Sequence, residues 1–153
     1  MAYDLLAGVS ATPMSSAGNE ERRQANYSLY DRLRTAQNVG DRETWLSCLA
    51  EDIVFEAPAY SKDGPIASGR DAMGRVFERL TEVFSSLSYE IKRFIPAVDP
   101  DLVIVEVRGD NEVASNKQRY RNDYLFLVEC RNDKITRIYE YSNPLVYSSA
   151  VET

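Results

Sequence analysis

The chain has 153 residues, of which 44% are hydrophobic and 27% charged, a composition that suits one ordinary globular domain with its own core. It carries 18 Lys and Arg against 24 Asp and Glu, a net charge of −6. This acidic balance argues against a nucleic-acid or anionic-membrane partner, because both bind basic surfaces. The absence of histidine excludes Ser-His-Asp and Cys-His nucleophile systems and histidine-ligated metal sites. We expect no metal and no cofactor.

The two cysteines, Cys48 and Cys130, lie within apolar stretches rather than in loops. Buried free thiols in a reducing compartment are the expected state, and a disulfide between them is the alternative. No apolar run has the length of a membrane span, and the N-terminus lacks the basic region and long apolar core of a signal peptide. We therefore expect a cytoplasmic protein without a membrane partner.

The N-terminal part predicts an arm followed by two helices. Residues 1–19 are rich in Ser, Ala, Gly, Pro and Thr without a period, which predicts a flexible arm. A helix is expected from an N-cap at Asn19 to a stop at Gly40. Asp41 is expected to cap a second helix containing Trp45. The apolar residues at helical spacing in the first helix are Ala25, Leu29, Leu33 and Ala36.

A strand and a third helix follow. Residues 53–57 are apolar and β-branched and end at Pro58, which predicts a strand. The turn-rich segment 58–69 is long for a simple connection and is a candidate lid over a pocket. Ser68 or Asp71 is expected to cap the helix that comes next. Its apolar stripe, expected to face the core, consists of Met73, Val76, Phe77, Leu80, Val83 and Phe84.

The remaining sequence predicts an antiparallel meander. Four segments are rich in β-branched and aromatic residues: 89–95, 102–113, 120–129 and 134–141. Turns are expected at residues 96–100, 109–111 and 131–133. Together the elements predict a single α+β domain over residues 20–147, with three helices against one face of a curved, mostly antiparallel sheet and a tail at 148–153.

The last hairpin leaves two registers open. A two-residue loop pairs Leu125 with Glu140, whereas a three-residue loop with Asp133 in the left-handed position pairs Tyr124 with Glu140. The second register separates charged from apolar residues far better, and we adopt it. One face then carries Asn122, Tyr124, Phe126, Val128, Thr136, Ile138 and Glu140.

In this register Glu140 is the one charged side chain on an apolar, aromatic face. Desolvation raises the pKa of such a carboxyl group and makes it a usable proton shuttle near neutral pH. Tyr124 and Asn122 are the residues that would orient the carboxyl group or polarise a substrate carbonyl. The alternative for Glu140 is an exposed position at a strand end or a bond to a backbone amide.

Several sequence segments resemble the NTF2-like superfamily, especially its SnoaL-like members. They are the helix pair, the segment 51–55 (EDIVF), and Gly69-Arg70-Asp71-Ala72 at a helix start. The ending 139–145 (YEYSNPL) resembles the phenazine-biosynthesis A/B proteins, in which an acidic residue, an aromatic residue and a later Asn or Asp close the last strand. The resemblance covers about residues 20–147 and places Asn143 at the Asn or Asp position.

This resemblance implies a cone-shaped α+β fold with a pocket at its wide end and a homodimer formed through the outer sheet face. It also implies that Glu140 is the acid–base residue. Two departures narrow the chemistry. Ala57 stands where ketosteroid isomerases have their base, and no histidine is present for chemistry of the scytalone-dehydratase or strict phenazine type.

The sequence therefore predicts a cofactor-independent isomerase, cyclase or dehydratase of specialised metabolism, acting on a small hydrophobic oxygenated molecule. A non-catalytic domain that binds a small molecule or a partner is the main alternative, and an epoxide-opening hydrolase is a third. Tyr27, Tyr30 and Tyr60 are further candidates for substrate contact. Glu56, and Glu106 with Arg108, are weaker candidates, since a solvated ion pair also explains the latter two.

Overall fold

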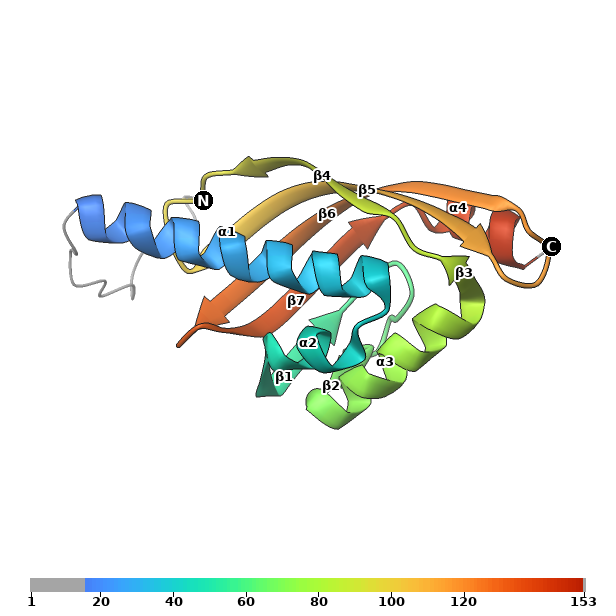
Figure 1. Ribbon diagram of the computed structural model, residues 1–153, viewed down its shortest axis with the longest axis horizontal. Helices are drawn as coiled ribbons and strands as arrows, with labels where there is room; N and C mark the ends of the chain where they lie inside the picture. The colour runs from blue at the N-terminus through green and yellow to red at the C-terminus, as the bar shows by residue number, and fades with distance from the viewer. Residues whose placement is uncertain (1–15, 153) are drawn as a thin grey trace, which may run out of the picture.

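The computed structural model describes residues 16–152, which form one curved seven-stranded sheet with helices on its concave side (Figure 1). The strand order is β2-β1-β7-β6-β5-β3, with β4 also paired to β5. The strands are β1 (Leu49–Glu56), β2 (Ala67–Ser68), β3 (Phe84–Ser86), β4 (Tyr89–Ile95), β5 (Leu102–Val113), β6 (Arg119–Arg131) and β7 (Lys134–Ser142). The α+β class and the curved, mostly antiparallel sheet are confirmed. β1 is parallel to β7 and closes the sheet beside the meander.

Helix α1 (Ser16–Val39) lies along the concave side of the sheet. Residues 16–19, expected in the arm, are helical, so Asn19 is not an N-cap; the rest of the arm lies outside the described residues. Leu33 and Ala36 are buried as predicted, Leu29 is half-buried and Ala25 is exposed; Asn26 and Tyr30 complete the buried face. Gly40, at φ 73°, ends the helix as expected.

Two shorter helices complete the layer on this side. Asp41 caps α2 (Arg42–Ser47) by accepting a hydrogen bond from the Thr44 N–H at 3.0 Å, as predicted. Helix α3 (Arg70–Val83) has Gly69 at its N-cap without a side-chain hydrogen bond, so the predicted caps Ser68 and Asp71 are wrong. The left-handed backbone at this position, φ 88°, explains why glycine occupies it.

The meander β4–β7 is antiparallel and sequential, as predicted. The expected turn at residues 109–111 is wrong, because β5 runs without a break through Gly109 and Asn111. The chain turns instead at residues 114–118. Gly109 lets the rings of Tyr89 and Tyr124 lie close to the backbone of β5. The prediction failed because its neighbours Asp110 and Asn111 are residue types that are common in turns.

The β6–β7 hairpin differs from both registers that the sequence left open. Asn132 and Asp133 both have positive φ, at 51° and 58°, and form a two-residue turn. A bulge at Thr136 then shifts the pairing by one residue, so Phe126 lies opposite Glu140 and Tyr124 lies opposite Ser142. The predicted pairing of Tyr124 with Glu140 is therefore wrong. Beyond the bulge, however, the side chains of both strands lie on the predicted faces of the sheet.

The C-terminal segment forms a fourth helix that the sequence reading did not anticipate. Helix α4 (Pro144–Val151) includes residues assigned to the tail and packs against β6. Asn143 caps it by accepting a hydrogen bond from the Leu145 N–H at 3.0 Å, and Pro144 occupies its first turn. Cys48 and Cys130 are buried free thiols in the core.

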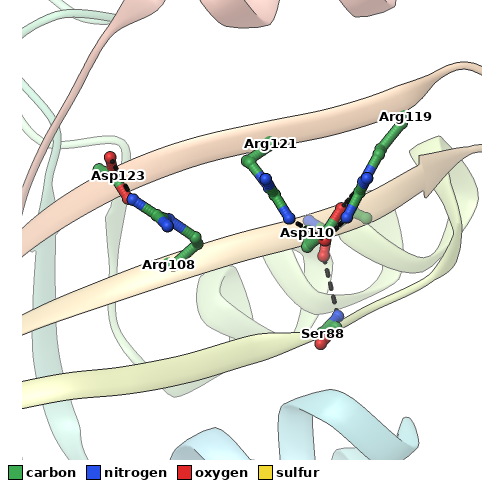
Figure 2. A network of polar contacts seen from close by, with 7 residues as sticks. Ser88, Arg108, Asp110, Arg119, Arg121 and Asp123 are labelled. Carbon is green, nitrogen blue, oxygen red and sulfur yellow. Dashed lines mark hydrogen bonds and ion pairs between the residues drawn. The ribbon is translucent and has the colours of Figure 1, made fainter.

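The convex face of the sheet carries paired charges around a few half-buried apolar side chains. Arg108 binds Asp123 at 2.8 Å, and Asp110 binds both Arg119 and Arg121, as Figure 2 shows. Hydrogen bonds, chiefly from Arg119, lower the pKa of Asp110 well below its usual range. The half-buried apolar side chains lie further along the same face of β5 and β6 and are Ile104, Leu125 and Leu127. Among residues 16–152, no helix is long and apolar enough to cross a bilayer.

Candidate active site

A pocket of about 560 Å³ lies between the concave face of the sheet and helices α1 and α3. Its walls are mostly apolar and aromatic. Besides the helices, they are formed by residues of β1, β4, β6 and β7 and by the segment 58–66. A cavity of this size and lining suits a small, largely apolar molecule. Among the described residues, Glu140 is the one carboxylate in the wall of this pocket.

Glu140 is a partly buried acid in the wall of this pocket. Within residues 16–152 its carboxylate makes no hydrogen bond and no ion pair, although Phe126 faces it across the β6–β7 pair. Desolvation by burial raises its pKa from 4.5 to about 7. A carboxyl group with this pKa is present in both protonation states near neutral pH, which is the condition for accepting and returning a proton.

A cluster of tyrosine hydroxyls lies in the same wall. The Tyr120 and Tyr124 hydroxyls are hydrogen-bonded at 2.9 Å, and Tyr89 packs against Tyr124 with ring centroids 5.7 Å apart. Tyr124 is two residues from Phe126 on β6, so it is a diagonal neighbour of Glu140. Burial raises the pKa of all three hydroxyls, that of Tyr120 to about 12, so they remain protonated donors.

Two buried asparagines hold this cluster from behind. Asn122 donates hydrogen bonds to the Tyr120 hydroxyl at 2.8 Å and to the Asn143 carbonyl at 2.9 Å. Asn111 donates to the Tyr89 hydroxyl at 3.1 Å and accepts from the Ser88 N–H at 2.9 Å. Both asparagines are at most 4% exposed, and neither lines the pocket. Their amides therefore orient the tyrosines rather than a ligand.

Gly109 makes room for the tyrosine rings. A Cβ atom at this position would lie 2.9 Å from the Tyr124 ring and 3.2 Å from the Tyr89 ring. The glycine faces Asn122 on β6 and Tyr89 on β4, at the centre of three strands. The two rings can meet only because the strand between them has no side chain here.

The segment 58–66 forms one side of the pocket, as its length suggested. Tyr60 and Ile66 line the cavity, and the Tyr60 hydroxyl lies 3.2 Å from Ser142 Oγ. The Tyr60 ring also meets the edge of Tyr147 on α4, with centroids 5.6 Å apart. The segment is thus held to the C-terminal end of β7 and to α4 by side-chain contacts alone.

Three arginines lie at the helical side of the pocket. Arg34 is engaged, since it bonds Asp31 at 2.6 Å and the Tyr89 carbonyl at 2.9 Å. Arg75 and Arg79 project from α3 and are exposed. In residues 16–152 no group of three or more Cys, Asp and Glu side chains is arranged to hold a metal ion.

The predicted site residues divide into two groups. Glu140, Tyr124, Tyr30 and Tyr60 line the one pocket. Tyr27 does not: its ring stacks on Phe94 at 4.1 Å, and its hydroxyl is buried without a hydrogen-bond partner in the described residues. Asn122 and Asn143 lie behind the wall, Asn143 as a helix cap.

The weaker candidates are structural ion pairs outside the pocket. Glu56 binds Arg137 at 2.6 Å, Glu106 binds Arg93 at 2.6 Å, and Arg108 binds Asp123. Glu106 and Arg108 thus pair with other strands rather than with each other. Sequence reasoning missed Tyr89, Asn111 and Tyr120, although their alternation along β4, β5 and β6 places them on the concave face together with Tyr124.

Comparison with known proteins identifies the family. The model of the SnoaL-like domain matches residues 30–138, so the chain belongs to the SnoaL-like family, with the NTF2-like fold. The matched region ends two residues before Glu140. A curated relative, the uncharacterized protein YesE of Bacillus subtilis, is 27% identical over 111 residues, covering 72% of this chain and 76% of that protein.

Solved structures share the fold at lower identity. A candidate isomerase from Bacillus subtilis superposes with a TM-score of 0.77 at 23% identity, covering 84% of this chain and 94% of that one. A phenazine biosynthesis-related protein from Pseudomonas aeruginosa gives 0.75 at 20% identity, covering 89% and 90%. A candidate polyketide cyclase from Silicibacter gives 0.71 at 17% identity, covering 85% and 97%.

Proposed function

We propose that the protein is an acid–base enzyme that isomerises, cyclises or dehydrates a small hydrophobic oxygenated molecule, with Glu140 as the proton shuttle. The single observation that carries the proposal is a partly buried carboxyl group with a pKa of about 7 in the wall of an apolar pocket, unpaired within residues 16–152. Neutral-pH proton transfer needs such a group, and no histidine is available.

The walls of the pocket set the roles of the other residues. Tyr124, hydrogen-bonded to Tyr120, faces the substrate as a hydrogen-bond donor, while Tyr30 and Tyr60 bound the space that it occupies. Rate enhancement comes from a tuned pKa and from orientation, without a covalent intermediate. The names of the solved relatives, an isomerase and a polyketide cyclase among them, are consistent with this chemistry.

The test is hydrogen exchange at the C–H bond next to the carbonyl of a panel of aromatic ketones, followed by NMR in D₂O. We expect the wild-type protein to catalyse exchange on its preferred ketone and Glu140→Gln to reduce the rate about 100-fold or more. Glu129→Gln, an exposed glutamate of the same hairpin, is the matched control and should leave the rate unchanged. Full exchange by Glu140→Gln would refute the enzyme and leave a binding domain as the better account.

The remaining features of the proposal concern assembly and location. We propose a homodimer through the convex sheet face, where Ile104, Leu125 and Leu127 are half-buried in the single chain. The charges around them are already paired within the chain, which reduces the cost of covering them. We also propose a role in specialised metabolism and a location in the cytoplasm, a reducing compartment that fits the two free thiols.

A further inference from the structure

The orientation of two buried amides carries information about the pocket. Asn111 accepts a hydrogen bond from the backbone N–H of Ser88, so the group that it turns to Tyr89 is its NH₂. Asn122 faces the backbone carbonyl of Asn143, which can only accept, so its NH₂ also points to Tyr120. Backbone groups thus fix both amides as donors to the tyrosines.

These donors determine where the hydroxyl protons can go. The oxygens of Tyr89 and Tyr120 each accept an amide hydrogen, so their own protons must be donated elsewhere. Tyr124 contacts both residues: its hydroxyl is bonded to that of Tyr120 at 2.9 Å, and its ring packs against the Tyr89 ring with centroids 5.7 Å apart. The contact between Tyr120 and Tyr124 uses only one hydroxyl proton, so the three tyrosines keep a spare proton for a ligand. The contact of the Tyr60 hydroxyl with Ser142 Oγ at 3.2 Å likewise uses only one of two hydroxyl protons, which leaves the surplus in place.

We infer that Asn111 and Asn122 are positioning residues that force the tyrosine cluster to act as a hydrogen-bond donor to the ligand, with Tyr124 as the residue that presents the spare proton. Tyr124 lines the pocket and is the member without an amide of its own. The ligand class is accordingly a molecule with a carbonyl or other acceptor oxygen beside an apolar body. The inference deepens the proposed function, on which its catalytic meaning rests.

The chemical consequence follows from charge. If Glu140 removes a proton next to a carbonyl, negative charge develops on the carbonyl oxygen. A preorganised donor in an apolar pocket stabilises that charge without having to reorient. Glu140 and Tyr124, diagonal neighbours on adjacent strands, can then act on adjacent atoms of one substrate.

The test compares the binding of 1-indanone with that of indane, its hydrocarbon analogue. The wild-type protein should bind the ketone at least about fivefold tighter. Tyr124→Phe should bring the ratio near one. Asn122→Asp, whose carboxyl oxygen accepts the Tyr120 proton, should lower the ratio as well, whereas Asn122→Leu removes a donor without supplying an acceptor and should retain it.

A spectroscopic readout separates donation from packing. The carbonyl stretch of bound ¹³C-labelled 1-indanone should lie at lower frequency in the wild-type protein than in Tyr124→Phe. If Asn122→Asp does not fold, Asn111→Asp replaces it, because its carboxylate still accepts the Ser88 N–H while reversing the bond to Tyr89.

Three results would overturn the inference. The first is that 1-indanone binds no tighter than indane, or that neither binds. The second is a carbonyl stretch that does not change in Tyr124→Phe, and the third is an equal effect of Asn122→Asp and Asn122→Leu on the binding ratio. Glu140→Gln keeps every donor and should keep the preference for the ketone. Failure of the proposed function would instead appear as undiminished hydrogen exchange by Glu140→Gln.

Discussion

Glu140 owes its properties to its neighbours rather than to a charged partner. The aromatic and aliphatic side chains around it, Phe126 and Ile138 among them, withdraw water from the carboxylate without replacing its hydrogen bonds. Its pKa of about 7 is the result, and the folded protein bears the free-energy cost of ionising it above that pH.

This cost predicts a pH-dependent effect on stability. Because the folded-state pKa lies above the unfolded value, Glu140 binds its proton more tightly in the folded protein, and stability falls as pH rises from about 4.5 to about 7. Glu140→Gln removes this dependence. Relative to the wild-type protein it should be more stable by up to roughly 3 kcal/mol at pH 8 and by much less at pH 4.5. Urea denaturation at the two pH values measures the difference, and a gap that does not change with pH would contradict it.

The candidate residue itself could be predicted from the sequence, but its partners could not. Alternation along a strand placed Glu140 on the apolar face, and this required only the correct parity of the register. Asn122 was expected to contact a ligand as well, since it lies on the same face. It is instead buried behind Tyr120, a position that depends on the depth of the pocket and cannot be read from the sequence. Tyr27 likewise sits on the correct helix but is covered by Phe94.

The β6–β7 hairpin shows what limits a prediction at the level of strands. The turn at Asn132 and Asp133 was identifiable by composition, but the bulge at Thr136 has no sequence signature and moves every later partner by one residue. The bulge also brings the faces back into the arrangement favoured by charge segregation. Side-chain faces were therefore predictable where individual pairs were not.

The contact between β4, β5 and β6 at Gly109 gives a second test. Gly109→Ala places a methyl group against the Tyr89 and Tyr124 rings, and we expect a loss of about 1–3 kcal/mol in stability together with weaker ketone binding. Gly74→Ala is the matched control. Its Cβ would meet only the mobile end of Arg42, and alanine favours the helix, so this variant should be neutral or stabilised. Equal thermal denaturation profiles for the two variants would contradict the packing argument.

The molecule as a whole is a curved sheet that curls over helices α1 and α3 (Figure 1). The pocket lies between the sheet and these helices. Hydrophobic periodicity and the order of the elements were enough to predict this architecture. Helix α4 was missed because it has only eight residues and its apolar side chains form no stripe at helical spacing. It nevertheless supplies Tyr147 to the pocket wall.

The proposed homodimer can be tested at the convex face. If two copies pair through this face, Leu127→Glu should convert a dimer into a monomer, because it places a charge in the middle of the apolar area beside Ile104. Val98→Glu, at a fully exposed loop position, is the control and should leave the dimer intact. Analytical ultracentrifugation distinguishes the states. A wild-type protein that is monomeric at all concentrations would rule out the proposed interface.

The central claim is that a desolvated Glu140 exchanges a proton near neutral pH. The most direct measurement is a ¹³C NMR titration of the glutamate side-chain carboxyl groups, with Glu140→Gln used to assign the signal. The account predicts that this signal titrates with a pKa near 7. A Glu140 signal that titrates near the ordinary value of about 4.3 would show a solvated or paired carboxylate and would contradict the proton-shuttle account.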